Sequence, residues 1–106
     1  MNTLQNWISL KKDADGRQIA SIFFVKPNPE QYPDYYEVIR EPIDLKTIDM
    51  KITKSIYKSI DDMMNDVFLM FKNAKQYNEP NSLVYQDAVL LEQLARSKVW
   101  GWALTL

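Results

Sequence analysis

The sequence predicts an all-α fold of four helices, with a long connection after the first helix and a short one before the last. Apolar residues recur at helical spacing across residues 60–77, which indicates one long, buried helix. Prolines interrupt residues 25–43, so this stretch cannot be a regular helix. Only about four residues separate the long helix from the next helical pattern, and helices joined so tightly usually pack antiparallel.

The first helix is predicted before residue 24, on apolar residues at three- and four-residue spacing. These residues are Leu4, Trp7, Ile8, Ile19, Ile22 and Phe23. Gly16 interrupts the pattern inside a polar run, where it either breaks or bends the helix.

Residues 25–43 are predicted to form one long, stiff loop. The loop carries Pro27, Pro29, Pro33 and Pro42, together with Tyr32, Tyr35 and Tyr36. Structureless connections longer than about 12–15 residues are uncommon in compact domains and are usually functional or disordered. The aromatic content argues against disorder, so we expect this loop to carry function.

The second and third helices have clear start signals. Asp44 can cap a short helix that buries Leu45, Ile48 and Ile52. Ser59 and Asp62 resemble a capping box at the start of the long third helix. The apolar positions of that helix are Ile60, Met63, Met64, Val67, Phe68, Met70, Phe71, Ala74 and Tyr77. Met50 and the methionines of the long helix are interpreted as core residues.

The last helix is predicted to begin near Ser82, whose hydroxyl can cap it, and to run toward Trp102. Antiparallel packing after a tight turn places Asn78 and Val84 at the same end of the bundle. Asn78 follows the long helix and precedes Glu79-Pro80, so its carboxamide stands beside a loop. Two roles are open for it: a helix-end residue in left-handed conformation, or a hydrogen-bonding group in a pocket.

Composition excludes most catalytic and metal chemistry. The chain has no cysteine and no histidine, which removes thiol and imidazole catalysis, disulfides and Cys/His zinc sites. Asp61 and Asp62 are the best remaining acid–base pair, but capping and the helix dipole explain them. We therefore expect no catalysis and no cofactor.

The charge balance and the hydropathy pattern narrow the partners. A net charge of −1 gives no long-range attraction for nucleic acid or an anionic membrane, so neither is expected as the primary ligand. The lysine-rich stretch of Lys51, Lys54 and Lys58 is better explained as a solvated face than as a phosphate site. The N-terminus lacks a signal-peptide pattern and no apolar run can span a bilayer, so the chain is expected to be soluble and unsecreted.

Three sequence blocks together resemble the bromodomain family. They are Tyr32-Pro33-Asp34-Tyr35-Tyr36-Glu37-Val38-Ile39, Glu41-Pro42-Ile43-Asp44-Leu45-Lys46-Thr47-Ile48 and Asn73-Ala74-Lys75-Gln76-Tyr77-Asn78. The resemblance covers about residues 16–95 and is nearest to polybromo and to the ATPase subunits of chromatin remodellers. It implies a left-handed four-helix bundle whose long first loop and short last loop frame a pocket for acetyl-lysine.

The resemblance assigns roles to single residues. Asn78 would donate its side-chain N–H to the acetyl carbonyl, and Tyr35 would hold a water that bridges to the same oxygen. Phe23 would form the pocket floor and Val84 a wall, although both are also explained as core residues. Tyr77 and Tyr32 complete the expected acetyl-lysine-binding set.

The resemblance also implies a function: a reader of acetylated histone tails that recruits or anchors a chromatin-associated complex in the nucleus. Its expected partners are acetylated histone peptides and other subunits of that complex. We expect residues 1–106 to be a single module taken from a larger protein. The alternative is a helical scaffold with a vestigial pocket.

Two departures from the family concern the pocket wall. Ser21-Ile22-Phe23 stands where the BET group has Trp-Pro-Phe, so the shelf beside the pocket should be less aromatic. Lys26 stands where many members have an apolar residue. A lysine stem can still lie along apolar surface.

Overall fold

A computed structural model describes residue 23 and residues 25–103, with side chains described up to residue 97. Within these residues the elements are α2 (Tyr35–Val38), α3 (Leu45–Thr53), α4 (Ile60–Tyr77) and α5 (Leu83–Ala103), and none is a strand. The helix predicted from Leu4, Trp7 and Ile8, with the interruption at Gly16, lies outside the described residues.

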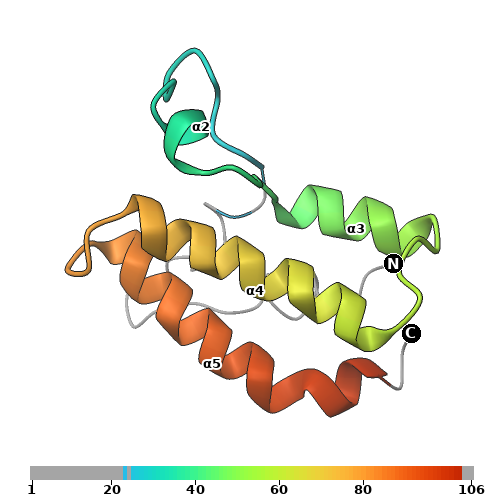
Figure 1. The fold of residues 1–106 in the computed structure, drawn as a ribbon. Coiled ribbons are helices and arrows are strands. Elements are labelled where there is room, and N and C mark those ends of the chain that lie inside the picture. Colours follow the sequence, from blue (N-terminus) through green and yellow to red (C-terminus); the bar gives the residue numbers. More distant parts are fainter. Residues whose placement is uncertain (1–22, 24, 104–106) are drawn as a thin grey trace.

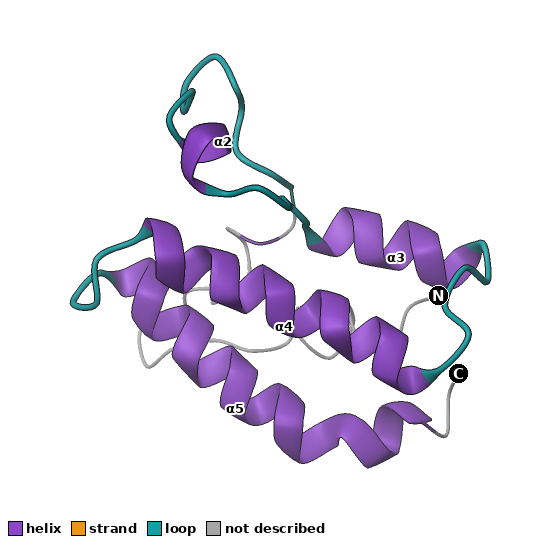
Figure 2. Cartoon of the chain, viewed as in Figure 1, coloured by secondary structure: helices purple, strands orange, loops and turns teal. Residues whose placement is uncertain are grey.

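The three longer helices lie side by side, with α4 between α3 and α5 and antiparallel to both (Figure 1). The loop that carries α2 projects from the bundle near the end where α4 leads into α5 (Figure 2). This arrangement gathers the two connections that the sequence singled out at one end of the molecule. The predicted proximity of Asn78 and Val84 is confirmed, since both line one cavity there.

The core lies along α4, whose apolar face packs on α3, α5 and Phe23. Val67 and Phe71 are fully buried, and the rings of Phe23 and Phe71 meet edge to face with centroids 5.5 Å apart. Buried residues of the cluster also include Leu45, Ile48, Met63, Met64, Met70, Ala74, Ala88, Leu91 and Ala95. Met50 does not belong to it: 40% of its surface is exposed, because it lies on the solvent side of α3.

The predicted helix starts are confirmed by hydrogen bonds. The Asp44 side chain accepts from the Thr47 backbone N–H at 2.7 Å, and Ser59 Oγ accepts from Asp62 N–H at 3.2 Å. Ser82 Oγ accepts from Tyr85 N–H at 3.2 Å. Each cap satisfies a backbone donor that has no partner inside the helix.

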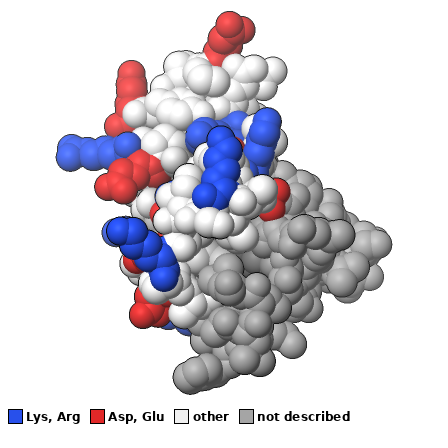
Figure 3. All heavy atoms as spheres, turned by 90° about the vertical axis from the view of Figure 1, so that its right-hand side faces the viewer, with Lys and Arg blue, Asp and Glu red and all other residues white. Residues whose placement is uncertain are grey.

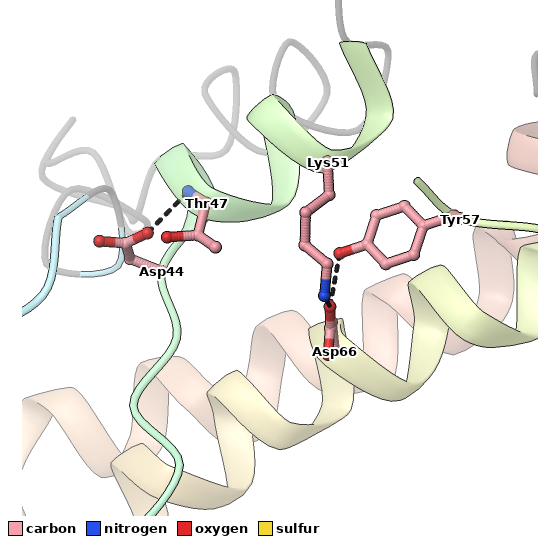
Figure 4. Close-up of polar contacts among 5 residues, drawn as sticks. All are labelled: Asp44, Thr47, Lys51, Tyr57 and Asp66. Carbon is pink, nitrogen blue, oxygen red and sulfur yellow. Dashed lines mark hydrogen bonds and ion pairs between the residues drawn. The ribbon is translucent and has the colours of Figure 1, made fainter. Parts of the chain in front are cut away.

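The connection from α3 to α4 is fixed by a half-buried polar cluster (Figure 4). Asp66 on α4 accepts from Lys51 Nζ at 2.7 Å and from the Tyr57 hydroxyl at 2.6 Å. The Lys51 ammonium also lies over the Tyr57 ring, 5.0 Å from its centroid. Lys51 therefore stabilises the fold, whereas the sequence interpretation placed it on a solvated lysine-rich face.

Residues 25–43 differ from the predicted continuous loop in one respect, because Tyr35–Val38 forms one helical turn. The four prolines flank this turn and do not enter it. The turn is closed by Ile39 N–H, which donates to Tyr35 O at 2.8 Å. Its effect is to bury Tyr35 while leaving Glu37 and Val38 exposed.

No helix among the described residues is long and apolar enough to cross a bilayer.

Candidate functional site

A cavity of about 260 Å³ lies at the end of the bundle, between the proline-rich loop and the ends of α4 and α5. It is lined by Phe23, Val25, Lys26, Pro27, Tyr32, Tyr35, Ile43, Asp44, Met70, Ala74, Tyr77, Asn78 and Val84. All six candidate residues from the sequence are therefore brought together around one space.

Asn78 ends α4 and its amide is held by that helix. Its backbone N–H and its side-chain Nδ2 both donate to Ala74 O, at 3.1 and 2.9 Å. Its backbone is extended, with φ −101° and ψ 152°, so the left-handed helix-end role is wrong. The side-chain bond uses one of the two N–H donors of a primary amide. Capping and presentation of a second donor are thus compatible in this residue.

Tyr35 enters the cavity from the single turn of α2. Its ring lies edge to face with Tyr77, at 4.9 Å between centroids, and with Tyr36, at 5.3 Å. Only 8% of the residue is exposed. Burial, followed by the nearby phenols and Asp44, raises the pKa of Tyr35, so its hydroxyl stays protonated and can donate. Tyr36 points elsewhere, and its hydroxyl donates to Pro27 O at 2.5 Å.

Phe23 and Val84 supply apolar surface from two sides. Phe23 is 6% exposed and belongs both to the core and to the cavity lining, so its two predicted roles coexist. Val84 lies in the first turn of α5, half-buried and packed against the core. Met70, Ala74 and Ile43 extend this apolar lining.

Tyr77 and Tyr32 form the wall nearest the acidic part of the loop. The Tyr77 hydroxyl donates to the Asp34 carboxylate, at 3.0 and 3.1 Å from its two oxygens. Tyr32 lines the cavity with 49% of its surface exposed. Among the six candidates, Tyr32 therefore has the weakest structural constraint.

The last turns of α4 also tether the loop, which the sequence did not reveal. Buried Asn73 donates from Nδ2 to Glu41 O at 2.8 Å, and Gln76 donates from Nε2 to Val38 O at 3.2 Å. Together with the Tyr77–Asp34 bond, three side chains of α4 hold the loop segment that carries Tyr35. Hydrogen bonds between a side chain and a distant backbone group leave no periodic pattern in the sequence, so the sequence did not predict these tethers.

Asp44 fixes the opposite wall. One oxygen accepts from Thr47 N–H and the other from the Lys26 backbone N–H at 2.8 Å, which joins the start of α3 to the first residues of the loop (Figure 4 shows the Thr47 bond). Burial disfavours the charged carboxylate, but these hydrogen bonds outweigh it and lower the pKa of Asp44. The sequence identified Asp44 only as a helix cap.

The cavity can hold a small neutral group that is apolar on one side and carries a hydrogen-bond acceptor. Apolar and aromatic side chains dominate its lining, Asn78 and Tyr35 contribute neutral polar groups, and Lys26 and Asp44 line one wall. No cluster of metal-ligating side chains occurs among the residues for which the structure gives positions.

Comparison with known proteins gives the family. The bromodomain family model matches residues 5–90. The chain belongs to the bromodomain family. The structure of the bromodomain from human BAZ1A superimposes with a TM-score of 0.82 at 25% identity, covering 93% of this chain and 87% of the other. The all-α four-helix bundle predicted from the sequence is thereby confirmed.

The relatives of this bromodomain are found in chromatin-remodelling proteins. Rsc4, a subunit of the chromatin structure-remodeling complex of Schizosaccharomyces pombe, is 40% identical over 89 residues, which are 84% of this chain and 16% of that protein. Snf21 of the same organism is 38% identical over 88 residues, covering 83% and 7%. Transcription regulatory protein SNF2 of Saccharomyces cerevisiae is 37% identical over 83 residues, covering 78% and 5%. The chain thus spans a small part of the length of these relatives.

Proposed function

We propose that this bromodomain is a non-catalytic reader that binds acetyl-lysine in histone tails. The observation that carries the proposal is the position of the Asn78 amide, which α4 orients beside a largely apolar cavity that Tyr35 also lines. Membership of the bromodomain family and the matching arrangement of the fold support it.

In this proposal each lining residue has a physical task. The second N–H of Asn78 donates to the acetyl carbonyl, and the Tyr35 hydroxyl reaches the same oxygen through a water molecule. The methyl group packs toward Phe23, and Val84 closes the side formed by α5. Tyr77 and Tyr32 enclose the aliphatic stem of the lysine.

Acetylation decides binding because it removes a charge. An unmodified lysine would bring a strongly hydrated ammonium against apolar walls, at a cost on the order of several kcal/mol. The acetylated side chain is neutral and presents a methyl group and a carbonyl acceptor to the cavity. Preference for the acetylated form thus arises from exclusion of one ligand as well as attraction of the other.

The surroundings of the cavity suit a basic peptide. Asp34, Glu37, Glu41 and Glu79 are exposed on the neighbouring loops, and exposed charges of this kind steer association more than they add affinity. Histone tails are rich in lysine and arginine. Similarity to subunits of chromatin-remodelling complexes supports a role in a nuclear complex that this module anchors to acetylated chromatin.

The test is binding of paired histone peptides that differ only in acetylation, measured by calorimetry. Acetylated peptides should bind with weak to moderate affinity, because one side chain and its neighbours bury less than a standard interface of about 1,600 Å². Asn78→Ala should abolish this binding. Asn81→Ala, which changes an exposed asparagine of the same connection outside the cavity, is the matched control.

Thermal unfolding of both variants separates binding from folding, since Asn78→Ala also removes the bond to Ala74 O. Equal heats for acetylated and unmodified peptides, unchanged in the Asn78→Ala variant, would sink the reader assignment and favour the scaffold alternative.

A further inference from the structure

A second hollow lies directly beside the acetyl-lysine cavity, on the other side of the chain segment Val25–Pro27. It is an open groove lined by Val25, Lys26, Pro27, Asn28, Pro29, Tyr36, Asp44, Lys46, Thr47 and Met50. Val25, Lys26, Pro27 and Asp44 line both spaces. A peptide that leaves the cavity over this wall therefore enters the groove.

The groove is cationic on its open side. Its ionisable side chains are Lys26, Lys46, Asp44 and Tyr36. Asp44 is 4% exposed and both its oxygens accept backbone N–H bonds, while the Tyr36 hydroxyl is bonded to Pro27 O. The two lysines are exposed, so they set the charge that a ligand meets.

The Lys26 charge helps to lower the pKa of Asp44, but neither lysine forms an ion pair among the described residues. The ion pairs there use Lys51, Lys75 and Arg96 as cations. Figure 3 views the other end of α3, where it leads into α4, and both basic and acidic side chains lie on the described part of that face. Two exposed ammonium groups on one groove match a dianion better than a single carboxylate.

We propose that this groove binds a phosphorylated serine or threonine on the same peptide as the acetyl-lysine. A phosphate carries about −1.5 to −2 charges near neutral pH and accepts several hydrogen bonds, which fits two lysine ammonium groups. An extended chain advances about 3.3–3.6 Å per residue, so a phosphorylated residue about four positions from the acetyl-lysine can lie roughly 14 Å from it, across the wall that the two spaces share. Exposed Val25 and Met50 offer apolar contact to neighbouring residues.

The inference rests on the proposed function and predicts which way the bound peptide runs across the cavity. The side of the cavity near Asp34 and Glu79 favours basic residues, whereas the side near Lys26 and Lys46 favours an anionic one. Phosphorylation next to an acetyl-lysine would then strengthen recognition on one side only.

The experiment measures binding to synthetic peptides of one fixed sequence with a central acetyl-lysine. Serine, phosphoserine or glutamate is placed at each of about four positions on either side, the range set by chain reach. Phosphoserine on one side should tighten binding by about fivefold or more relative to serine, and glutamate by less, as expected for charge-assisted bonds at an exposed site.

Lys46→Gln is the decisive variant, because Lys46 lines the groove but not the cavity. It should abolish most of the phosphoserine gain while leaving the affinity for the serine peptide unchanged. Lys72→Gln, which changes an exposed lysine of α4 outside both spaces, should retain the gain. Lys26 lines both spaces, so Lys26→Gln is measured with the serine and the phosphoserine peptide. The ratio of the two affinities should be smaller than in the unmodified chain.

The inference is overturned if phosphoserine gives no gain at any position, gives the same gain at every position, or keeps its gain in Lys46→Gln. These outcomes leave the reader function intact, because the serine peptides still show whether binding depends on acetylation. Loss of that dependence would instead refute the proposed function, and this inference with it.

Discussion

In the proposed function, single hydroxyl and amide groups decide what the cavity recognises. Tyr35 is the sharpest case, because its ring is held by two aromatic neighbours and only its hydroxyl is chemically distinctive. Removing that oxygen leaves the packing nearly unchanged. The contribution of the hydroxyl to binding can therefore be measured separately from the contribution of the ring.

Tyr35→Phe should weaken binding of an acetylated peptide by roughly 5- to 15-fold, the value of about 1–1.5 kcal/mol for one hydrogen bond. Thermal stability should stay close to that of the unmodified chain. The matched control is Tyr85→Phe, which removes a phenol of α5 outside the cavity and should not change affinity. Equal affinities for both variants would show that the Tyr35 hydroxyl takes no part in recognition.

Asp44 should make stability depend on pH. Its pKa is lowered in the folded state, so ionised Asp44 stabilises the fold above its unfolded pKa of about 3.9 and this stabilisation is lost as pH falls through the lower folded value. We expect the difference in unfolding free energy between the unmodified chain and Asp44→Asn to be largest near neutral pH. It should shrink below about pH 4, as chemical denaturation at both pH values can measure.

A difference that stays constant between neutral and acidic pH would contradict this role of the Asp44 charge. Asp49→Asn is a suitable control, since Asp49 lies on α3 after its first turn and is not the cap.

At the scale of elements, α4 has two tasks. Its central turns form the core, and its last turns supply Asn78 and the tethers from Asn73, Gln76 and Tyr77 to the loop. The candidate site therefore depends on the helix that also has more buried residues than any other described helix. Loss of the Asn73 or the Gln76 tether should loosen the loop without removing a residue that lines the cavity.

Asn73→Ala tests this coupling. Asn73 is buried and its bond to Glu41 O spans 32 positions of sequence, so its loss should cost about 0.5–1.5 kcal/mol of stability, the net value of one hydrogen bond. Amide hydrogen exchange in residues 34–41 should accelerate and peptide affinity should fall. Asn65→Ala, at an exposed position of the same helix, should leave both unchanged.

The elements also show how far sequence reasoning reaches. The bounds of α4, the caps at Asp44, Ser59 and Ser82, and the common position of Asn78 and Val84 follow from local patterns, because periodicity and capping are properties of neighbouring residues. The turn at Tyr35–Val38 was missed, since prolines on both sides obscure four helical residues. Met50 was placed in the core together with the methionines of α4, and this was wrong: it does not share the Leu45, Ile48 and Ile52 side of α3, and it is exposed.

The same distinction applies to the candidate site. Its six proposed residues were named through resemblance to a family, and the structure brings them around one cavity. The groove beside it, the tethers from α4 and the second bond of Asp44 join residues far apart in sequence, so no local pattern predicts them. Their roles in binding remain predictions.

The molecule as a whole should respond to its ligand as one cooperative unit. A peptide present at about ten times its Kd stabilises the folded state by about 1.4 kcal/mol, which raises Tm by about 5 °C or more for a domain of this size. Thermal unfolding with acetylated and unmodified peptides measures this shift. The acetylated peptide should produce it in the unmodified chain and not in Asn78→Ala.

A shift of the same size with the unmodified peptide would contradict selective binding. The Asn81→Ala variant should reproduce the shift of the unmodified chain, which controls for substitution within the α4–α5 connection.

The bond from Asn78 Nδ2 to Ala74 O has a consequence for errors of recognition. A lysine ammonium can only donate hydrogen bonds, so Asn78 could bind it only through Oδ1. This would require the side-chain amide to rotate by half a turn. That rotation would press Oδ1 against the Ala74 carbonyl, two acceptors with no proton between them. In the proposed function, the backbone of α4 therefore favours the acetylated ligand, because it holds Asn78 in the orientation that presents an N–H donor.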